Sequence, residues 1–143
     1  MSEQENELKK KDSLLTRNEL VIQSMRALLL LSMSDCNIKV ILSEQGINNV
    51  AVYGMGIVGV SFCDVMEKAG IHIDYCVDMN EEINVNNKDV RHRIDEITND
   101  VDLMVVSSEY YYHEIYIEVS AFFNKPIVRI GEFINELLLM NHY

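Results

Sequence analysis

The sequence predicts an α/β domain in which helices cover an open parallel sheet of about five strands in the order 3-2-1-4-5. Three observations support this prediction. From residue 47 onward, apolar segments of strand length alternate with amphipathic segments of helix length. Residues 101–108 are apolar almost throughout, as central parallel strands are. Residues 50–59 run from an apolar strand through a glycine-rich turn into a helix.

The composition argues against several classes of protein. Hydrophobic residues make up 48% of the 143-residue chain, which is enough to form a core and disfavours disorder. The most apolar run, residues 20–33, is interrupted by Gln23 and Arg26 and is too short to cross a bilayer. The first residues do not resemble a signal peptide, so we expect a cytoplasmic protein without membrane insertion. A net charge of −11 disfavours nucleic acid as a partner.

The three cysteines are predicted to be buried and reduced. Cys36, Cys63 and Cys76 are far apart in the sequence and lack C-x-x-C spacing. Each lies in or beside an apolar segment, which favours packed thiols over a metal site or a nucleophile. We therefore expect no metal.

Residues 1–46 are predicted to form a helical arm that precedes a nucleotide-binding domain at residues 47–143. Residues 1–12 are polar and are expected to fray. A long amphipathic helix follows, capped by Asp12 or Ser13, and a short second helix ends at Gly46. The apolar side of the long helix is too broad to face water, so we expect a homodimer through this helix or, alternatively, packing on the sheet.

The remaining elements follow in order. Strands are predicted at residues 50–53, 71–78, 90–93, 101–108 and 125–130, helices at residues 59–69, 109–123 and 133–140, and a helical turn at residues 94–97. Residues 79–87 are polar and rich in asparagine. The basic cluster at residues 91–93 is interpreted as a charge-protected sheet edge, with contact to an anionic ligand as the alternative.

The glycine-rich turn is the basis of the functional prediction. Gly54, Gly56 and Gly59 have the G-x-G-x-x-G spacing between a strand and a helix, which is the context of a dinucleotide-binding turn. Gly54 permits a tight turn, Gly56 lets a pyrophosphate approach the backbone, and Gly59 lets the helix pack closely on the strand. A turn kept for packing alone is the alternative. The candidate cofactor-binding residues here are Gly54, Met55, Gly56, Ile57, Val58 and Gly59.

An acidic residue follows the second strand at the distance that the motif predicts. Asp78 lies nineteen residues after Gly59, where a carboxylate accepts hydrogen bonds from the ribose of the adenosine half. A carboxylate also repels a 2′-phosphate, which favours NAD over NADP. Asp78, Met79 and Asn80 are therefore candidate ribose-binding residues, although Asp78 can instead serve as a turn former.

Two serines follow the most apolar strand. In open parallel sheets, ligands bind outside the carboxyl ends of the strands where the strand order reverses, so we expect Ser107 and Ser108 beside the glycine turn. Ser108 can alternatively cap the next helix. Tyr110 and His113 are possible acid–base groups, but aromatic residues at helical spacing are typical of packing and no lysine lies four residues after Tyr110, Tyr111 or Tyr112. Catalytic residues therefore remain unassigned.

From about residue 38 to residue 139, the chain resembles the small Rossmann-like nucleotide-binding domains of bacterial surface-polysaccharide biosynthesis proteins. The resemblance rests on residues 52–59, 77–80 and 101–107 and on the helix before the first strand. It implies similarity to the NAD-binding part of nucleotide-sugar dehydratases. It also implies similarity to the amino-terminal domain of sugar acetyltransferases, which cups a UDP-sugar, but the Gly-His pair of those enzymes is missing here.

Three functions are compatible with these residues. The first is a binding module for a nucleotide, NAD(H) before a nucleotide-sugar, in nucleotide-sugar or surface-polysaccharide metabolism. The second is a nucleotide-sugar oxidoreductase or dehydratase completed by a partner. The third is a structural interaction domain that binds no ligand. Because no substrate domain is recognisable in the sequence, we favour the first and third functions over the second.

Overall fold

The structure is a computed structural model that describes residues 2–141, and its five-stranded sheet is parallel throughout, in the order β3-β2-β1-β4-β5. The strands are β1 (Asn49–Tyr53), β2 (His72–Val77), β3 (Val90–Arg91), β4 (Leu103–Val106) and β5 (Ile127–Arg129). The helices are α1 (Glu3–Met33), α2 (Ile38–Glu44), α3 (Ile57–Lys68), α4 (Tyr112–Ser120) and α5 (Ile130–Met140), with a 3-10 turn η1 (Ile94–Glu96). The predicted α/β class, strand order and Rossmann-like topology are confirmed.

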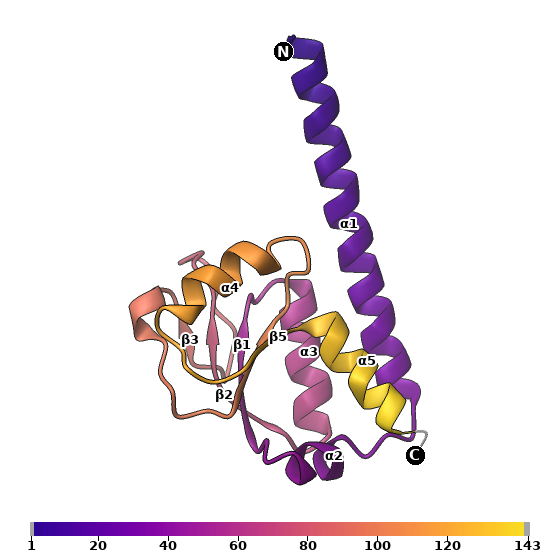
Figure 1. Cartoon of the computed structure of the whole chain (residues 1–143), viewed down its shortest axis with the longest axis vertical. Helices are drawn as coiled ribbons and strands as arrows, with labels where there is room; N and C mark the ends of the chain where they lie inside the picture. Colours follow the sequence, from indigo (N-terminus) through magenta and orange to yellow (C-terminus); the bar gives the residue numbers. More distant parts are fainter. Residues whose placement is uncertain (1, 142–143) are drawn as a thin grey trace.

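Helices cover both faces of the sheet (Figure 1). Helices α3 and α5 pack on one face, and α1 lies against these two helices, whereas α4 and η1 lie on the other face. Because side chains alternate along a strand, Val50 and Val52 of β1 enter the first core, and Ala51 and Tyr53 enter the second. Burial on both faces explains why the interior strands β1 and β4 are apolar at nearly every position.

Helix α1 begins at Glu3, much earlier than the sequence analysis predicts. Ser2 and Glu5 form a capping box, in which the Ser2 hydroxyl accepts from the Glu5 N–H at 3.2 Å and the Glu5 carboxylate accepts from the Ser2 N–H at 3.4 Å. This arrangement satisfies backbone donors that a helix otherwise leaves unpaired. The predicted helix start at residues 12–13 is therefore wrong, because residues 3–12 are helical and neither Asp12 nor Ser13 caps the helix. Residue 1 lies outside the described residues.

The two halves of α1 have different surroundings. In the carboxyl-terminal half, Leu28 and Leu31 are buried and join the core that α3 and α5 form with the sheet. In the amino-terminal half, residues 2–19 are all exposed, and this half projects beyond the body of the protein (Figure 1). The carboxyl-terminal half of α1 therefore packs on α3 and α5, and the amino-terminal half is exposed to solvent.

Three further boundaries differ from the prediction, each for a local reason. Helix α4 begins at Tyr112, after a loop at residues 107–111 in which the Ser108 hydroxyl accepts from the Tyr111 N–H. Strand β5 begins after Pro126, which has no N–H to donate but whose carbonyl accepts from the Met104 N–H at 3.0 Å. Helix α5 begins at Ile130, because the Glu109 carboxylate accepts from the Gly131 N–H at 2.7 Å and caps the helix.

The three cysteines are free thiols. Cys63 of α3 and Cys76 of β2 are buried, and the hydrogen bond to Cys76, together with burial, raises the pKa of the Cys63 thiol. Cys36 is half-buried, donates to the Leu137 carbonyl at 3.7 Å, and has its thiol pKa raised by burial. Limited access slows the reaction of all three thiols with electrophiles, and the raised pKa slows it further for Cys36 and Cys63.

We expect Ellman's reagent to label the native protein slowly and at Cys36 alone. Unfolding in guanidinium should expose all three thiols at once. Absorbance of the released thiolate, with and without denaturant and in a Cys36→Ser variant, measures this difference. Fast labelling of native Cys36→Ser would contradict the buried positions of Cys63 and Cys76.

Candidate functional site

The glycine turn connects β1 to α3 across the carboxyl end of the sheet. Gly54 has φ +97°, a left-handed conformation that side chains disfavour. Its N–H donates to the Val77 carbonyl at 2.7 Å, which ties the turn to the end of β2. A side chain at Gly54 would also collide with the Ser107 hydroxyl. The turn therefore requires glycine at this position for both conformation and space.

The other two glycines have different surroundings. A Cβ atom at Gly59 would overlap the carbonyl oxygen of Gly54, so α3 can lie directly on the turn only with glycine there. A Cβ atom at Gly56 would meet no atom within 4 Å. Gly54 and Gly59 are thus explained by packing, whereas Gly56 opens onto free space in front of α3.

The first turn of α3 presents unpaired backbone donors to this space. Gly56 is the N-cap residue and supplies no side-chain cap. The N–H groups of Ile57, Val58 and Gly59 have no intrahelical acceptor at a helix start, and the helix dipole adds positive potential there. Such a terminus favours an anion such as phosphate.

The two predicted serines lie beside the turn, as expected from strand order. Ser107 is buried, and its hydroxyl lies 2.8 Å from the Gly54 carbonyl and 3.1 Å from the Tyr53 carbonyl, to either of which it can donate. The Ser108 hydroxyl accepts from the Tyr111 N–H at 3.1 Å. Ser107 therefore positions the turn, and Ser108 stabilises the loop ahead of α4 without being the N-cap residue of that helix.

Asp78 lies against the opposite side of the turn. One carboxylate oxygen accepts from the Met55 N–H at 2.8 Å, and the other accepts from the Asn80 N–H at 2.9 Å. Asp78 therefore acts as a turn former, the alternative role that the sequence left open. Each oxygen keeps a second lone pair for a further donor. Met79 and Asn80 are exposed next to it.

A cleft of about 390 Å³ opens where the glycine turn, the loop after β4 and helix α1 meet. Its lining combines the predicted residues Gly54, Gly56, Ile57, Val58, Gly59, Ser107 and Ser108 with Glu109, Tyr110, Tyr111 and, from α1, Arg17, Leu20, Val21 and Ser24. The predicted residues Met55, which is buried, Asp78, Met79 and Asn80 do not belong to this lining. The structure therefore divides the predicted site between two sides of one turn.

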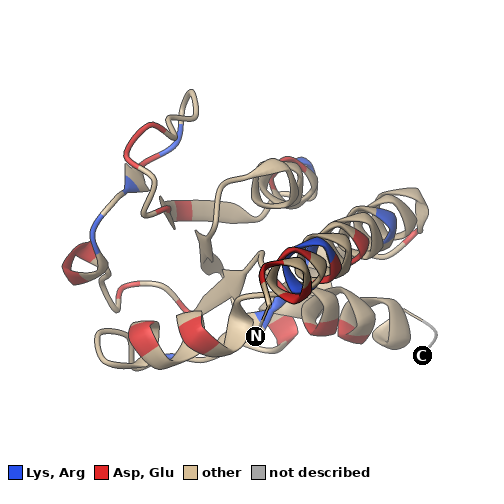
Figure 2. Cartoon of the chain, turned by 90° about the horizontal axis from the view of Figure 1, so that it is seen from above, with Lys and Arg blue, Asp and Glu red and all other residues tan. Residues whose placement is uncertain are grey.

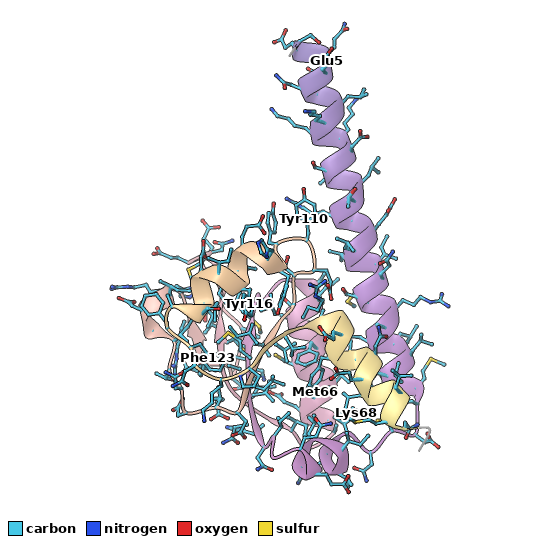
Figure 3. The ribbon with its side chains drawn as sticks, in the orientation of Figure 1. Glu5, Met66, Lys68, Tyr110, Tyr116 and Phe123 are labelled. Carbon is cyan, nitrogen blue, oxygen red and sulfur yellow. The ribbon has the colours of Figure 1, made fainter. Side chains whose placement is uncertain are left out.

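Arg17 brings a positive charge to the mouth of the cleft. Its guanidinium donates to the Tyr111 hydroxyl at 2.9 Å and lies 5.9 Å and 5.7 Å from the ring centroids of Tyr110 and Tyr111. In Figure 3, the labelled Tyr110 lies on the loop that approaches α1. Lys9 and Lys10 line an adjoining hollow of about 400 Å³ together with Arg17. A chain of net negative charge thus has a basic rim, formed by Lys9, Lys10 and Arg17, next to the cleft that the glycine turn lines.

Ser24 contributes a hydroxyl from the opposite wall. The residue is 5% exposed and lines both the cleft and a neighbouring cavity of about 550 Å³ between α1 and α5. Because Ser24 lines the cleft, its hydroxyl is a polar group that a ligand there can reach.

The residues that α1 contributes to the cleft are not predicted from the sequence, because no pattern places Arg17 or Ser24 near the turn. Lys9 and Lys10, which line the adjoining hollow, fall in the segment that is expected to fray. A signal was present, because Ser2 and Glu5 have the S-x-x-E spacing of a capping box. A helix that starts there places Lys10 and Arg17 seven residues apart on one face.

Other candidates from the sequence do not meet at the cleft. Tyr110 lines it, but His113 is exposed on α4 and is not part of the lining. In the basic cluster, Arg91 stacks on the Tyr75 ring at 3.9 Å and Arg93 pairs with Asp95 at 2.6 Å. These contacts hold the sheet edge together and favour the first interpretation of that cluster.

Comparison of the chain with protein-family models, curated proteins and solved structures finds no match. Along residues 2–141, no helix combines the length and apolar character needed to cross a bilayer. Over the same range, no group of His, Cys, Asp and Glu side chains has an arrangement that could hold a metal ion.

Proposed function

We propose that the protein binds a nucleotide-containing ligand through its phosphates in the cleft between the glycine turn and α1. The observation that carries the proposal is that Arg17 and Ser24 of α1 line the same cleft as the unpaired N–H groups at the start of α3. NAD(H) is the first candidate ligand, and a nucleotide-sugar is the alternative. A role in nucleotide-sugar or surface-polysaccharide metabolism follows from the resemblance noted above and is part of the proposal.

The phosphates would lie at the amino terminus of α3. The N–H groups of Ile57, Val58 and Gly59 would donate to one phosphate. The guanidinium of Arg17 has five N–H donors in a planar fork, of which one bonds to Tyr111. The remaining donors can bind phosphate oxygens in bidentate fashion. This arrangement explains why an acidic protein would carry its basic rim at this place.

The two halves of a dinucleotide would extend to the two sides of the turn. The adenosine half would lie over the end of β2, with its ribose against the free lone pairs of Asp78. The other half would enter the cleft beside Ser108 and Tyr110. The negative charge of Asp78 would disfavour a 2′-phosphate, so we propose NAD in preference to NADP.

We propose binding and no reaction. Glu109 is the carboxylate in the cleft lining, and it accepts from the Gly131 N–H at 2.7 Å and lies 3.9 Å from the Arg129 guanidinium. A carboxylate held in this way serves the structure of α5. The proposal therefore assigns no general acid or base.

Isothermal titration calorimetry with NAD⁺, NADH, NADP⁺, UDP-glucose and coenzyme A tests the proposal. We expect NAD⁺ or NADH to bind, with weaker binding of NADP⁺. A ligand at one hundred times its Kd should also stabilise the fold by about 2.7 kcal/mol in thermal unfolding. Binding of UDP-glucose in place of NAD(H) would select the alternative ligand, and no binding of any of the five would contradict the proposal.

Three variants locate the ligand. Gly56→Val fills the open space in front of α3, so it should abolish binding while circular dichroism shows a folded protein. Arg17→Gln removes a charge-assisted contact worth about 1.5–3 kcal/mol and should weaken binding roughly ten- to one-hundred-fold. Arg93→Gln changes an exposed arginine at the sheet edge, and affinity should remain at the wild-type value. Unchanged binding in Gly56→Val would mean that the ligand lies elsewhere.

A further inference from the structure

The face of α1 that points away from the body carries a line of large apolar side chains. Leu8, Leu15, Ile22 and Leu29 follow one another at intervals of seven residues and are between 58% and 66% exposed. Seven residues span nearly two helical turns, so these side chains lie along one line. We call them the apolar stripe. Contiguous apolar surface of this kind on a soluble protein marks an interaction site.

The apolar stripe and the docked face of α1 are on opposite sides of the helix. At about 100° per residue, Ser24 and Leu31 lie more than 150° from Ile22 around the helix axis. Both are buried against the body, whereas Ile22 is exposed. A second molecule can therefore cover the apolar stripe without displacing α1 from α3 and α5.

We propose that the apolar stripe is a homodimer interface in which the α1 helices of two copies pair in antiparallel orientation. The spacing of the stripe fits this orientation, because it reads the same in both directions. An antiparallel alignment places Leu8 of one copy against Leu29 of the partner copy. It also places Leu15 against Ile22 of the partner copy, and one two-fold axis generates each of these two contacts twice.

The charge distribution favours a second copy as the occupant. Helix α1 has five acidic residues (Glu3, Glu5, Glu7, Asp12, Glu19) and five basic residues (Lys9, Lys10, Lys11, Arg17, Arg26), so its net charge is zero. Figure 2 shows both signs along this helix. The net charge of −11 therefore resides entirely in the rest of the chain. Helix α1 is the element on which two copies approach with little repulsion.

Charge also favours the antiparallel orientation over the parallel one. The body packs on the carboxyl-terminal half of α1, so antiparallel pairing places the two acidic bodies at opposite ends of the helix pair. A parallel pair would bring both bodies to the same end. Asp12 and Arg26 lie on the same flank of the apolar stripe, and the antiparallel alignment brings Asp12 of one copy to Arg26 of the partner copy.

Light scattering coupled to size exclusion tests whether the dimer exists. At about 100 μM, well above a micromolar Kd, we expect the wild-type mass to be twice the 16.5 kDa of one chain. Ile22→Glu places a charge in the middle of the apolar stripe and should give a monomer. Ile117→Glu is the matched control, because Ile117 is 59% exposed on α4, and this variant should remain dimeric. A wild-type monomer, or a dimer that survives Ile22→Glu, would overturn the proposal.

Disulfide cross-linking tests the orientation. In a Cys36→Ser background, a mixture of Leu8→Cys and Leu29→Cys chains should form a covalent heterodimer under mild oxidation. Each of the two variants alone should remain uncross-linked in an antiparallel pair. Cross-linking of Leu8→Cys with itself would show parallel pairing and contradict the proposed arrangement. Neither experiment depends on ligand binding, so the dimer can fail without affecting the proposed function.

Discussion

Gly59→Ala is expected to destabilise the protein by roughly 3 kcal/mol, at the upper end of the cost of overpacking. The added methyl group would overlap the Gly54 carbonyl oxygen. That carbonyl cannot move aside easily, because it is within hydrogen-bond distance of the Ser107 hydroxyl and the Gly54 N–H bonds to Val77. The start of α3 would have to separate from the turn. Urea denaturation followed by circular dichroism measures the loss of stability.

Gly56→Ala is the matched control for this variant. The same methyl group would meet no atom within 4 Å at Gly56, and the residue has φ −76°. Loss of a glycine N-cap costs about 1 kcal/mol, so the urea midpoint should fall by only about a third of the fall expected for Gly59→Ala. Equal midpoints for the two variants would show that α3 does not depend on close contact with the turn.

The second large effect is expected for Tyr75→Ala, at about 3–5 kcal/mol. Tyr75 of β2 is fully buried in the second core, and the Arg91 guanidinium lies 3.9 Å from its ring centroid. Truncation would leave a cavity and remove the surface on which Arg91 stacks. Urea denaturation again measures the change, and a loss below about 1 kcal/mol would contradict the packing described here.

Tyr75→Phe separates the hydroxyl from the ring. The phenol donates to the Thr98 carbonyl at 2.8 Å and accepts from the Thr98 N–H at 3.3 Å, so its loss should cost about 1–2 kcal/mol. Burial raises the pKa of the Tyr75 phenol above its ordinary 10.0. The folded state therefore holds this proton more tightly than the unfolded state. The wild type should lose this stabilisation as the pH rises above 10, and the gap to Tyr75→Phe should narrow.

The central part of the fold was predictable because local pattern and burial agree there. Residues 101–106 are apolar except for Asp102, a pattern typical of a strand that is covered on both faces. Residues 103–106 of this run form the interior strand β4. The glycine spacing likewise reflects local geometry, since Gly54 has a positive φ and Gly59 lies against the turn. These features depend on neighbouring residues in the sequence, so the sequence carries a readable signal.

The composition of the cleft was less predictable because it depends on contacts between distant segments. Arg17 reaches Tyr111 across 94 positions of sequence, and nothing near Arg17 indicates that partner. Ser24 is one of three serines in α1, and no local pattern distinguishes it from the other two. The carboxylate of Asp78 could be assigned to ribose or to a turn from its position, and its bond to the Met55 N–H appears only in three dimensions.

Helix α1 presents one face to the cleft and the opposite face to solvent, and this arrangement has a thermodynamic consequence. A rigid helix cannot rotate or slide on one face while the other stays in place. A ligand in the cleft and a second copy on the apolar stripe would therefore each favour particular positions of this one helix, so the two binding events would affect each other. If ligand binding changes the dimerisation constant by some factor, dimerisation must change the affinity for the ligand by the same factor.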